Sequence, residues 1–76
     1  MNSDWHDRIE SDPQILHGKP CFRETRIPVG LVLGYLASGR TAGEILVQLP
    51  GLETADIIAA IEYARDLANF EAVVTA

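Results

Sequence analysis

The feature of this sequence that most constrains the fold is a helical repeat of apolar residues near its carboxyl end. From Thr54 to about Asn69, apolar residues recur at intervals of three and four. This spacing places them on one face of an α-helix and predicts a helix over 54–69. The predicted core face consists of Ile57, Ile58, Ile61, Ala64, Leu67 and Ala68. The predicted outer, acidic face consists of Asp56, Ala59, Glu62, Tyr63 and Asp66.

Turn and capping signals predict two shorter helices before this one. Pro28 suits the first turn of a helix and Gly39 suits the left-handed residue just past its end, so we predict a helix over about 29–38. Thr41 and Glu44 have the spacing of a capping box, which predicts that a second helix begins there. The Pro50-Gly51 pair ends that second helix after barely two turns.

Two glycines on the first predicted helix leave its packing open. Gly30 and Gly34 lie four residues apart, so they share one face and permit close approach of another backbone. We expect that face to pack loosely against the N-terminal part of the chain, and we keep a contact between two copies in a dimer as the alternative.

The N-terminal part of the chain is rich in turn residues. Its apolar residues come in short pairs separated by proline and glycine, which predicts short strands and turns. We therefore predict one domain of mainly α class: an irregular β arm or hairpin over 1–28, a three-helix core over 29–69 and a C-terminal tail over 70–76. Because the turn "LPGLE" at 49–53 is short, the last two helices have the outline of a helix-turn-helix.

The basic residues are concentrated in one segment. The chain has a net charge of −5 and only six Lys and Arg residues. Four of those six lie between positions 19 and 40, where Glu24 is the single acid. Such a cluster can meet DNA phosphates, the carboxylates of a protein partner, or only water.

No catalytic or metal-binding set is recognisable in the sequence. His17 and Cys21 lie four apart, but no second ligand pair has zinc-like spacing. Gly18-Lys19 lacks the remaining residues of a phosphate-binding loop. We therefore expect no enzyme activity, no metal, no cofactor and no small-molecule substrate.

Hydropathy and the N-terminus predict a cytoplasmic protein. The longest apolar run, at 29–37, has nine residues, whereas a membrane span needs about 20. The first residues are acidic and polar, unlike a secretory signal. We expect no membrane association.

Several motifs carry a resemblance to a known family. They are "GKP" at 18–20, "TRIPV" at 25–29, "ASGRTAGEIL" at 37–46 and "PGLETADIIAAIEYA" at 50–64. Together they resemble the domain of unknown function family 433. The resemblance implies a homeodomain-like or winged helix-turn-helix core after a β arm, and a role as a VapB-type antitoxin encoded beside a PIN-like ribonuclease.

Residues and resemblance together give a leading hypothesis. The chain is expected to be an antitoxin-like module that neutralises a PIN-like ribonuclease toxin and, as a homodimer, binds operator DNA. The alternative is a stand-alone helix-turn-helix DNA-binding regulator without a toxin. The expected contact residues for partner or nucleic acid are Lys19, Arg23, Thr25, Arg26 and Arg40. This hypothesis requires guanidinium groups that lie together on one surface and are not locked in ion pairs with the chain's own acids.

One position departs from the family pattern. The family usually has glycine between the arginine and "TR", where this chain has Glu24. Glycine there permits a turn with positive φ, whereas glutamate strains such a turn and partly cancels the positive patch.

Overall fold

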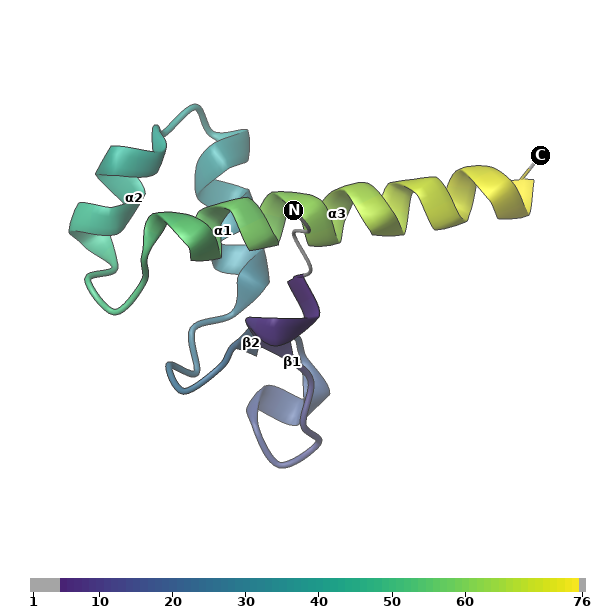
Figure 1. The fold of residues 1–76 in the computed structure, drawn as a ribbon, viewed down its shortest axis with the longest axis horizontal. Helices are drawn as coiled ribbons and strands as arrows, with labels where there is room; N and C mark the ends of the chain where they lie inside the picture. Colours follow the sequence, from purple (N-terminus) through teal and green to yellow (C-terminus); the bar gives the residue numbers. More distant parts are fainter. Residues whose placement is uncertain (1–4, 76) are drawn as a thin grey trace.

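Three α-helices and a short β-hairpin arm make up the described part of the chain (Figure 1). The computed structural model describes the backbone of residues 5–75 and the side chains of residues 5–69. The arm contains two short 3-10 helices, η1 (Trp5–Asp7) and η2 (Leu16–Gly18), and two strands, β1 (Ile9–Glu10) and β2 (Cys21–Phe22). The helices are α1 (Val29–Ala37), α2 (Ala42–Gln48) and α3 (Thr54–Thr75). The fold is therefore mainly helical, as predicted.

Local signals placed α1 and α2 correctly. Pro28 directly precedes α1, and Gly39 follows it with φ of +96°. At the start of α2 the hydroxyl of Thr41 accepts the amide of Glu44 at 3.2 Å, and the Glu44 carboxylate accepts the amide of Thr41 at 2.9 Å. This reciprocal capping confirms the predicted helix start.

The arm is an antiparallel hairpin joined to the helices at its base. In the sheet Ile9 pairs with Phe22 and Glu10 pairs with Cys21. The next residues extend the ladder, because the amide of Arg23 donates to the carbonyl of Arg8 at 2.9 Å. The side chains of Ile9 and Phe22 are buried in the same core as the helices. The arm is thus part of the domain and not a separate appendage.

The hydrophobic core lies where the hairpin meets the three helices. Among the described side chains, the buried apolar residues are Ile9, Cys21, Phe22, Val29, Val32, Ile45, Leu52, Ile57, Ala59 and Ala60. Phe22 is the largest of those that are fully buried. Burying a phenylalanine stabilises a fold by about 1.5–3 kcal/mol, so strand β2 contributes strongly to this core.

The predicted core face of α3 is wrong in part. Ile58 and Ile61 are half exposed, at 50% and 49%, although both were expected in the core. Ala59 and Asp56, expected on the outer face, are buried. Small residues let α3 pack closely against the body, and a count of large apolar residues does not detect such a face. Tyr63, also expected outside, packs against the core.

Helix α3 extends past the body of the domain (Figure 1). It ends at Thr75 and not near Asn69, so residues 70–75 of the predicted tail are helical. The last residue of that tail, Ala76, lies outside the described residues. Leu67 is seven residues after the buried Ala60, and therefore on the same face, yet it is 49% exposed. The part of α3 that carries Leu67 therefore extends beyond the hairpin and the other two helices (Figure 1). No helix in the described part of the chain is long and apolar enough to cross a membrane.

The two glycines of α1 face open space. No atom lies within 4 Å of the position that a Cβ would occupy on Gly30 or Gly34. The expected packing of this face against the arm is therefore wrong. A contact between two copies stays a prediction.

Candidate functional site

A hydrogen-bonded loop over residues 22–27 carries three of the predicted contact residues, Arg23, Thr25 and Arg26. The amide of Phe22 donates to the carbonyl of Ile27 at 3.0 Å and closes the loop. The hydroxyl of Thr25 donates to the Phe22 carbonyl at 2.9 Å and accepts the Ile27 amide at 3.0 Å. Both hydrogen-bonding roles of Thr25 are thus used inside the loop. Sequence analysis predicted that Thr25 contacts a partner. In the structure its side chain fixes the loop.

The backbone of this loop is strained at two residues. Glu24 has φ of +66° and Arg26 has φ of +60°. A left-handed conformation costs a residue with a Cβ roughly 1–2 kcal/mol. The strain expected from glutamate at position 24 is therefore present. Both side chains are exposed on the surface of the arm.

Arg23 does not point freely toward solvent. Its guanidinium donates to the Glu10 carboxylate at 3.0 Å and to the His6 carbonyl at 3.1 Å. These contacts hold β1 and η1 against the end of β2. One of the three arginines expected to bind a partner is therefore engaged by an acid of the same chain.

The other predicted cations differ from Arg23. Lys19 and Arg26 are exposed, and within residues 5–69 neither has an ion pair or side-chain hydrogen bond. Arg40 lies with its guanidinium 4.8 Å from the centre of the Tyr35 ring and donates to the Gln48 side chain at 3.3 Å. It lines a separate hollow beside α2. The structure therefore does not bring Arg40 together with Arg23 and Thr25.

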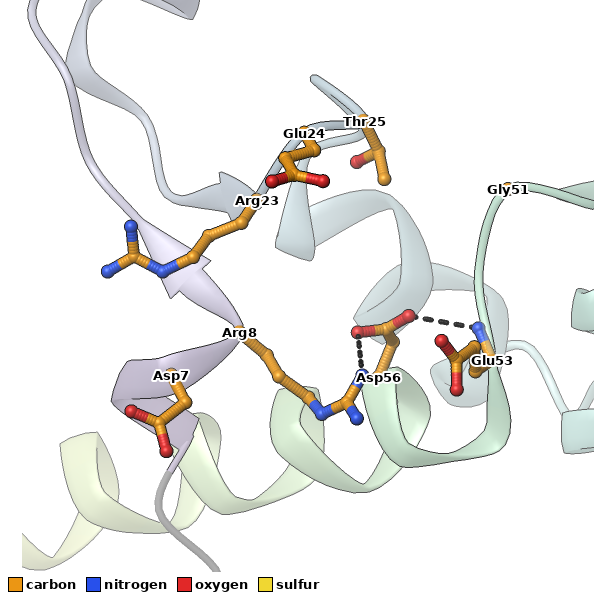
Figure 2. Close-up of a pocket in the computed structure, with 8 residues that line it drawn as sticks. All are labelled: Asp7, Arg8, Arg23, Glu24, Thr25, Gly51, Glu53 and Asp56. Carbon is orange, nitrogen blue, oxygen red and sulfur yellow. Dashed lines mark hydrogen bonds and ion pairs between the residues drawn. The ribbon is translucent and has the colours of Figure 1, made fainter.

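A polar hollow of about 540 Å³ lies beside the strained loop (Figure 2). It is lined by Asp7, Arg8, Arg23, Glu24, Thr25, Gly51, Glu53 and Asp56. Figure 2 shows Glu24 and Thr25 on one side, and the Arg8–Asp56 pair on another. The hollow thus joins the arm, the α2–α3 turn and the start of α3, and it has carboxylates as well as guanidinium groups in its wall.

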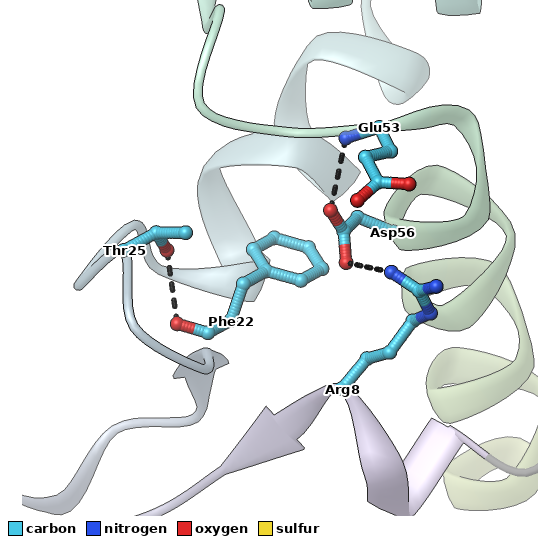
Figure 3. A network of polar contacts seen from close by, with 5 residues as sticks. All are labelled: Arg8, Phe22, Thr25, Glu53 and Asp56. Atoms are coloured by element: carbon cyan, nitrogen blue, oxygen red, sulfur yellow. Dashed lines mark hydrogen bonds and ion pairs between the residues drawn. The ribbon is translucent and has the colours of Figure 1, made fainter.

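An ion pair fixes the arm to the start of α3 (Figure 3). Arg8 Nη1 donates to Asp56 Oδ1 at 3.1 Å, and Asp56 Oδ2 accepts the Glu53 amide at 2.9 Å. Asp56 is only 8% exposed. Sequence reasoning missed both Arg8 and Asp56. The signal for Asp56 was an acid in the third position of the helix, where it can accept the amide just before the helix.

Aromatic residues hold η1 against α3. Trp5 Nε1 donates to Asp66 Oδ2 at 2.7 Å, and the Trp5 ring meets the Tyr63 ring edge-on at 4.9 Å between centres. The His6 ring stacks on Trp5 at 3.8 Å. The hydrogen bond from Trp5, and then that from Arg65, lower the pKa of the Asp66 carboxyl. No sequence pattern pointed to this contact, because 61 positions separate its two partners.

The described site has neither a metal-ligand cluster nor an activated thiol. Within residues 5–69, no group of three His, Cys, Asp or Glu side chains is placed to hold a metal ion. The Cys21 side chain is buried, and burial, followed by the nearby Glu10 charge, raises the pKa of its thiol. A thiol in that state is a poor nucleophile. What the surface offers is a fixed loop, exposed charges and an adjoining hollow.

Comparison with known proteins identifies a family. A family model described as "Protein of unknown function (DUF433)" matches residues 9–64. No curated protein and no solved structure matches the chain. The family match begins at β1, includes the strained loop, α1 and α2, and ends within α3. Because it covers well over half of the 76 residues, the protein belongs to the DUF433 family.

Proposed function

We propose that this protein is an antitoxin-like module that binds and neutralises a PIN-like ribonuclease. In this proposal the surface that meets the partner is the 22–27 loop, and Arg26 is its central contact. The observation that carries the proposal is the state of Arg26: exposed, without an acid of its own within residues 5–69, and held on a hydrogen-bonded loop.

The chemistry of the two partners is complementary. A guanidinium is always charged and can bind both oxygens of one carboxylate. A ribonuclease site that binds a metal ion through carboxylates offers such groups. Since the loop is held by Thr25 and by the Phe22–Ile27 hydrogen bond, little backbone freedom is lost when Arg26 docks.

The charges around the loop favour a protein partner over DNA. Lys19 and Arg26 are the arm cations without intramolecular partners in the described chain. Two phosphate contacts would make the DNA-binding constant fall by only about 2 log units for each tenfold rise in salt concentration. Glu24 and Glu53 lie along the hollow beside the loop, where they would repel phosphates. A stand-alone DNA-binding regulator is therefore the alternative outcome of the test.

The test is co-expression of the tagged chain with the product of the gene adjacent to its own, which we expect to be the ribonuclease. We expect the two proteins to co-purify and RNA cleavage to be inhibited in proportion to the amount of complex. Arg26→Ala should weaken the complex by about 10-fold or more, because an interfacial Arg–carboxylate contact is lost. Arg65→Ala is the matched control, since Arg65 is an exposed arginine of α3 outside the arm.

Two results would contradict the proposal. One is the absence of any complex together with undiminished RNA cleavage. The other is an Arg26→Ala variant that binds the ribonuclease as tightly as the unchanged chain. Salt-dependent binding of upstream duplex DNA that weakens in Arg26→Ala, without ribonuclease binding, would support the DNA-binding regulator instead.

A further inference from the structure

Glu24 combines a strained backbone with a side chain that makes no hydrogen bond or ion pair with the described residues. Its φ of +66° is unfavourable for any residue with a Cβ. Its carboxylate has no hydrogen bond or ion pair within residues 5–69. Thr25, its neighbour, makes the side-chain hydrogen bonds that fix the loop. The glutamate side chain therefore contributes nothing visible to folding that offsets the strain.

Four described residues other than glycine have positive φ, namely Leu16, His17, Glu24 and Arg26, and such strained positions cluster at functional sites. Glycine would adopt the same backbone conformation without strain. What glutamate adds at this position is a fixed negative charge, two residues from Arg26 and at the side of the 540 Å³ hollow (Figure 2). The hollow is open to a long side chain that approaches beside the loop.

We infer that Glu24 determines partner specificity, and that its carboxylate binds a lysine or arginine side chain of the protein that the arm recognises. This inference rests on the proposed function and defines the partner further. The partner surface must present an acid to Arg26 and, beside it, a base to Glu24. A surface with this alternation of charge is readily made by a folded protein and cannot be made by a phosphate backbone.

The sign of a charge effect tests the inference. Glu24→Gln keeps the size and the strain of the side chain but removes its charge. It should weaken binding of a partner that places a base against residue 24. With DNA the same change should strengthen binding, because a repulsive charge is removed.

The experiment measures binding of the ribonuclease recovered by co-purification, and of duplex DNA from upstream of the gene, at low salt. For Glu24→Gln we expect about 3- to 10-fold weaker ribonuclease binding and an unchanged Tm. For Glu24→Gly we expect the same loss of affinity, with Tm raised by several degrees because the strain is relieved. Glu62→Gln is the matched control, since it removes a carboxylate from α3 away from the loop.

The outcomes separate this inference from the function on which it rests. Ribonuclease binding that is unchanged or tighter in Glu24→Gln overturns the role of Glu24 and leaves the antitoxin proposal in place. Absence of ribonuclease binding by the unchanged chain, with DNA binding that tightens in Glu24→Gln, overturns both. The inference is supported if both Glu24 variants bind the ribonuclease more weakly and if Glu24→Gly, despite this weaker binding, has a higher Tm than the unchanged chain.

Discussion

Replacing Asp56 with alanine tests how the arm is held against the helices. The carboxylate makes two contacts, one with Arg8 Nη1 at 3.1 Å and one with the Glu53 amide at 2.9 Å. The first contact joins η1 and β1 to α3, and the second satisfies a backbone donor at the start of α3. The variant removes both contacts at a position that is 8% exposed.

The magnitude follows from the two contacts. Loss of a side-chain acceptor at a helix N-terminus costs about 1 kcal/mol. A hydrogen bond between charged groups contributes about 1.5–3 kcal/mol, but the Arg8 side chain is 39% exposed and regains water in the variant, so we assign it about 1 kcal/mol. The total is about 2 kcal/mol of unfolding free energy, or a fall in Tm of about 8–16 °C for a domain of this size.

Urea and thermal unfolding of the unchanged protein and four variants separate the contributions. Asp56→Asn keeps an oxygen for the Glu53 amide but loses the charge, and it should cost about half as much as Asp56→Ala. Arg8→Ala and the double variant complete a double-mutant cycle, with an expected coupling of about 1 kcal/mol between residues 8 and 56. A loss below about 0.5 kcal/mol in Asp56→Ala, or strict additivity in the cycle, would refute this account.

Three further predictions concern backbone, charge and burial. Gly39→Ala should lower stability by about 1 kcal/mol because φ is +96°, whereas Gly30→Ala, in a helix with open space around it, should raise stability by about 0.5–1 kcal/mol; thermal unfolding measures both. Folding favours the ionised form of Asp66 because its pKa is lowered, so the stabilisation by Trp5 should be complete above pH 3.8 and lost as pH falls through the lowered value. Trp5→Phe should abolish this part of the acid dependence of Tm; equal acid dependence in both proteins would count against the Trp5–Asp66 bond. Cys21 should react with a thiol reagent far more slowly in the folded protein than in urea, and equal rates would contradict its burial.

Features that depend on neighbouring residues in the sequence were predictable. The start of α2 follows from Thr41 and Glu44, whose side chains reach each other's amides within one turn. Gly39 and Pro28 mark the limits of α1 for equally local reasons. The positive φ of Glu24 was anticipated only through the resemblance to the family, in which glycine usually stands at this position, because glutamate itself gives no such signal.

Features that depend on distant residues were not predictable. Whether Arg23 is available to a partner is decided by Glu10 and by the His6 carbonyl, which reach it only once β1 pairs with β2. Which face of α3 is buried depends on where the arm and α1 pack. The apolar repeat specified a helix there but did not show that Ala59 faces inward while Ile58 faces outward.

The contact of Trp5 with α3 gives the protein an intrinsic optical reporter. The chain has a single tryptophan, so all indole fluorescence comes from the point where the N-terminal segment lies on α3. Detachment of that segment would change the emission before the helices unfold, whereas an arm that unfolds only with the domain would give one transition by fluorescence and by circular dichroism. A truncation that appears to remove a short leader would delete this anchor and the Arg8 ion pair together.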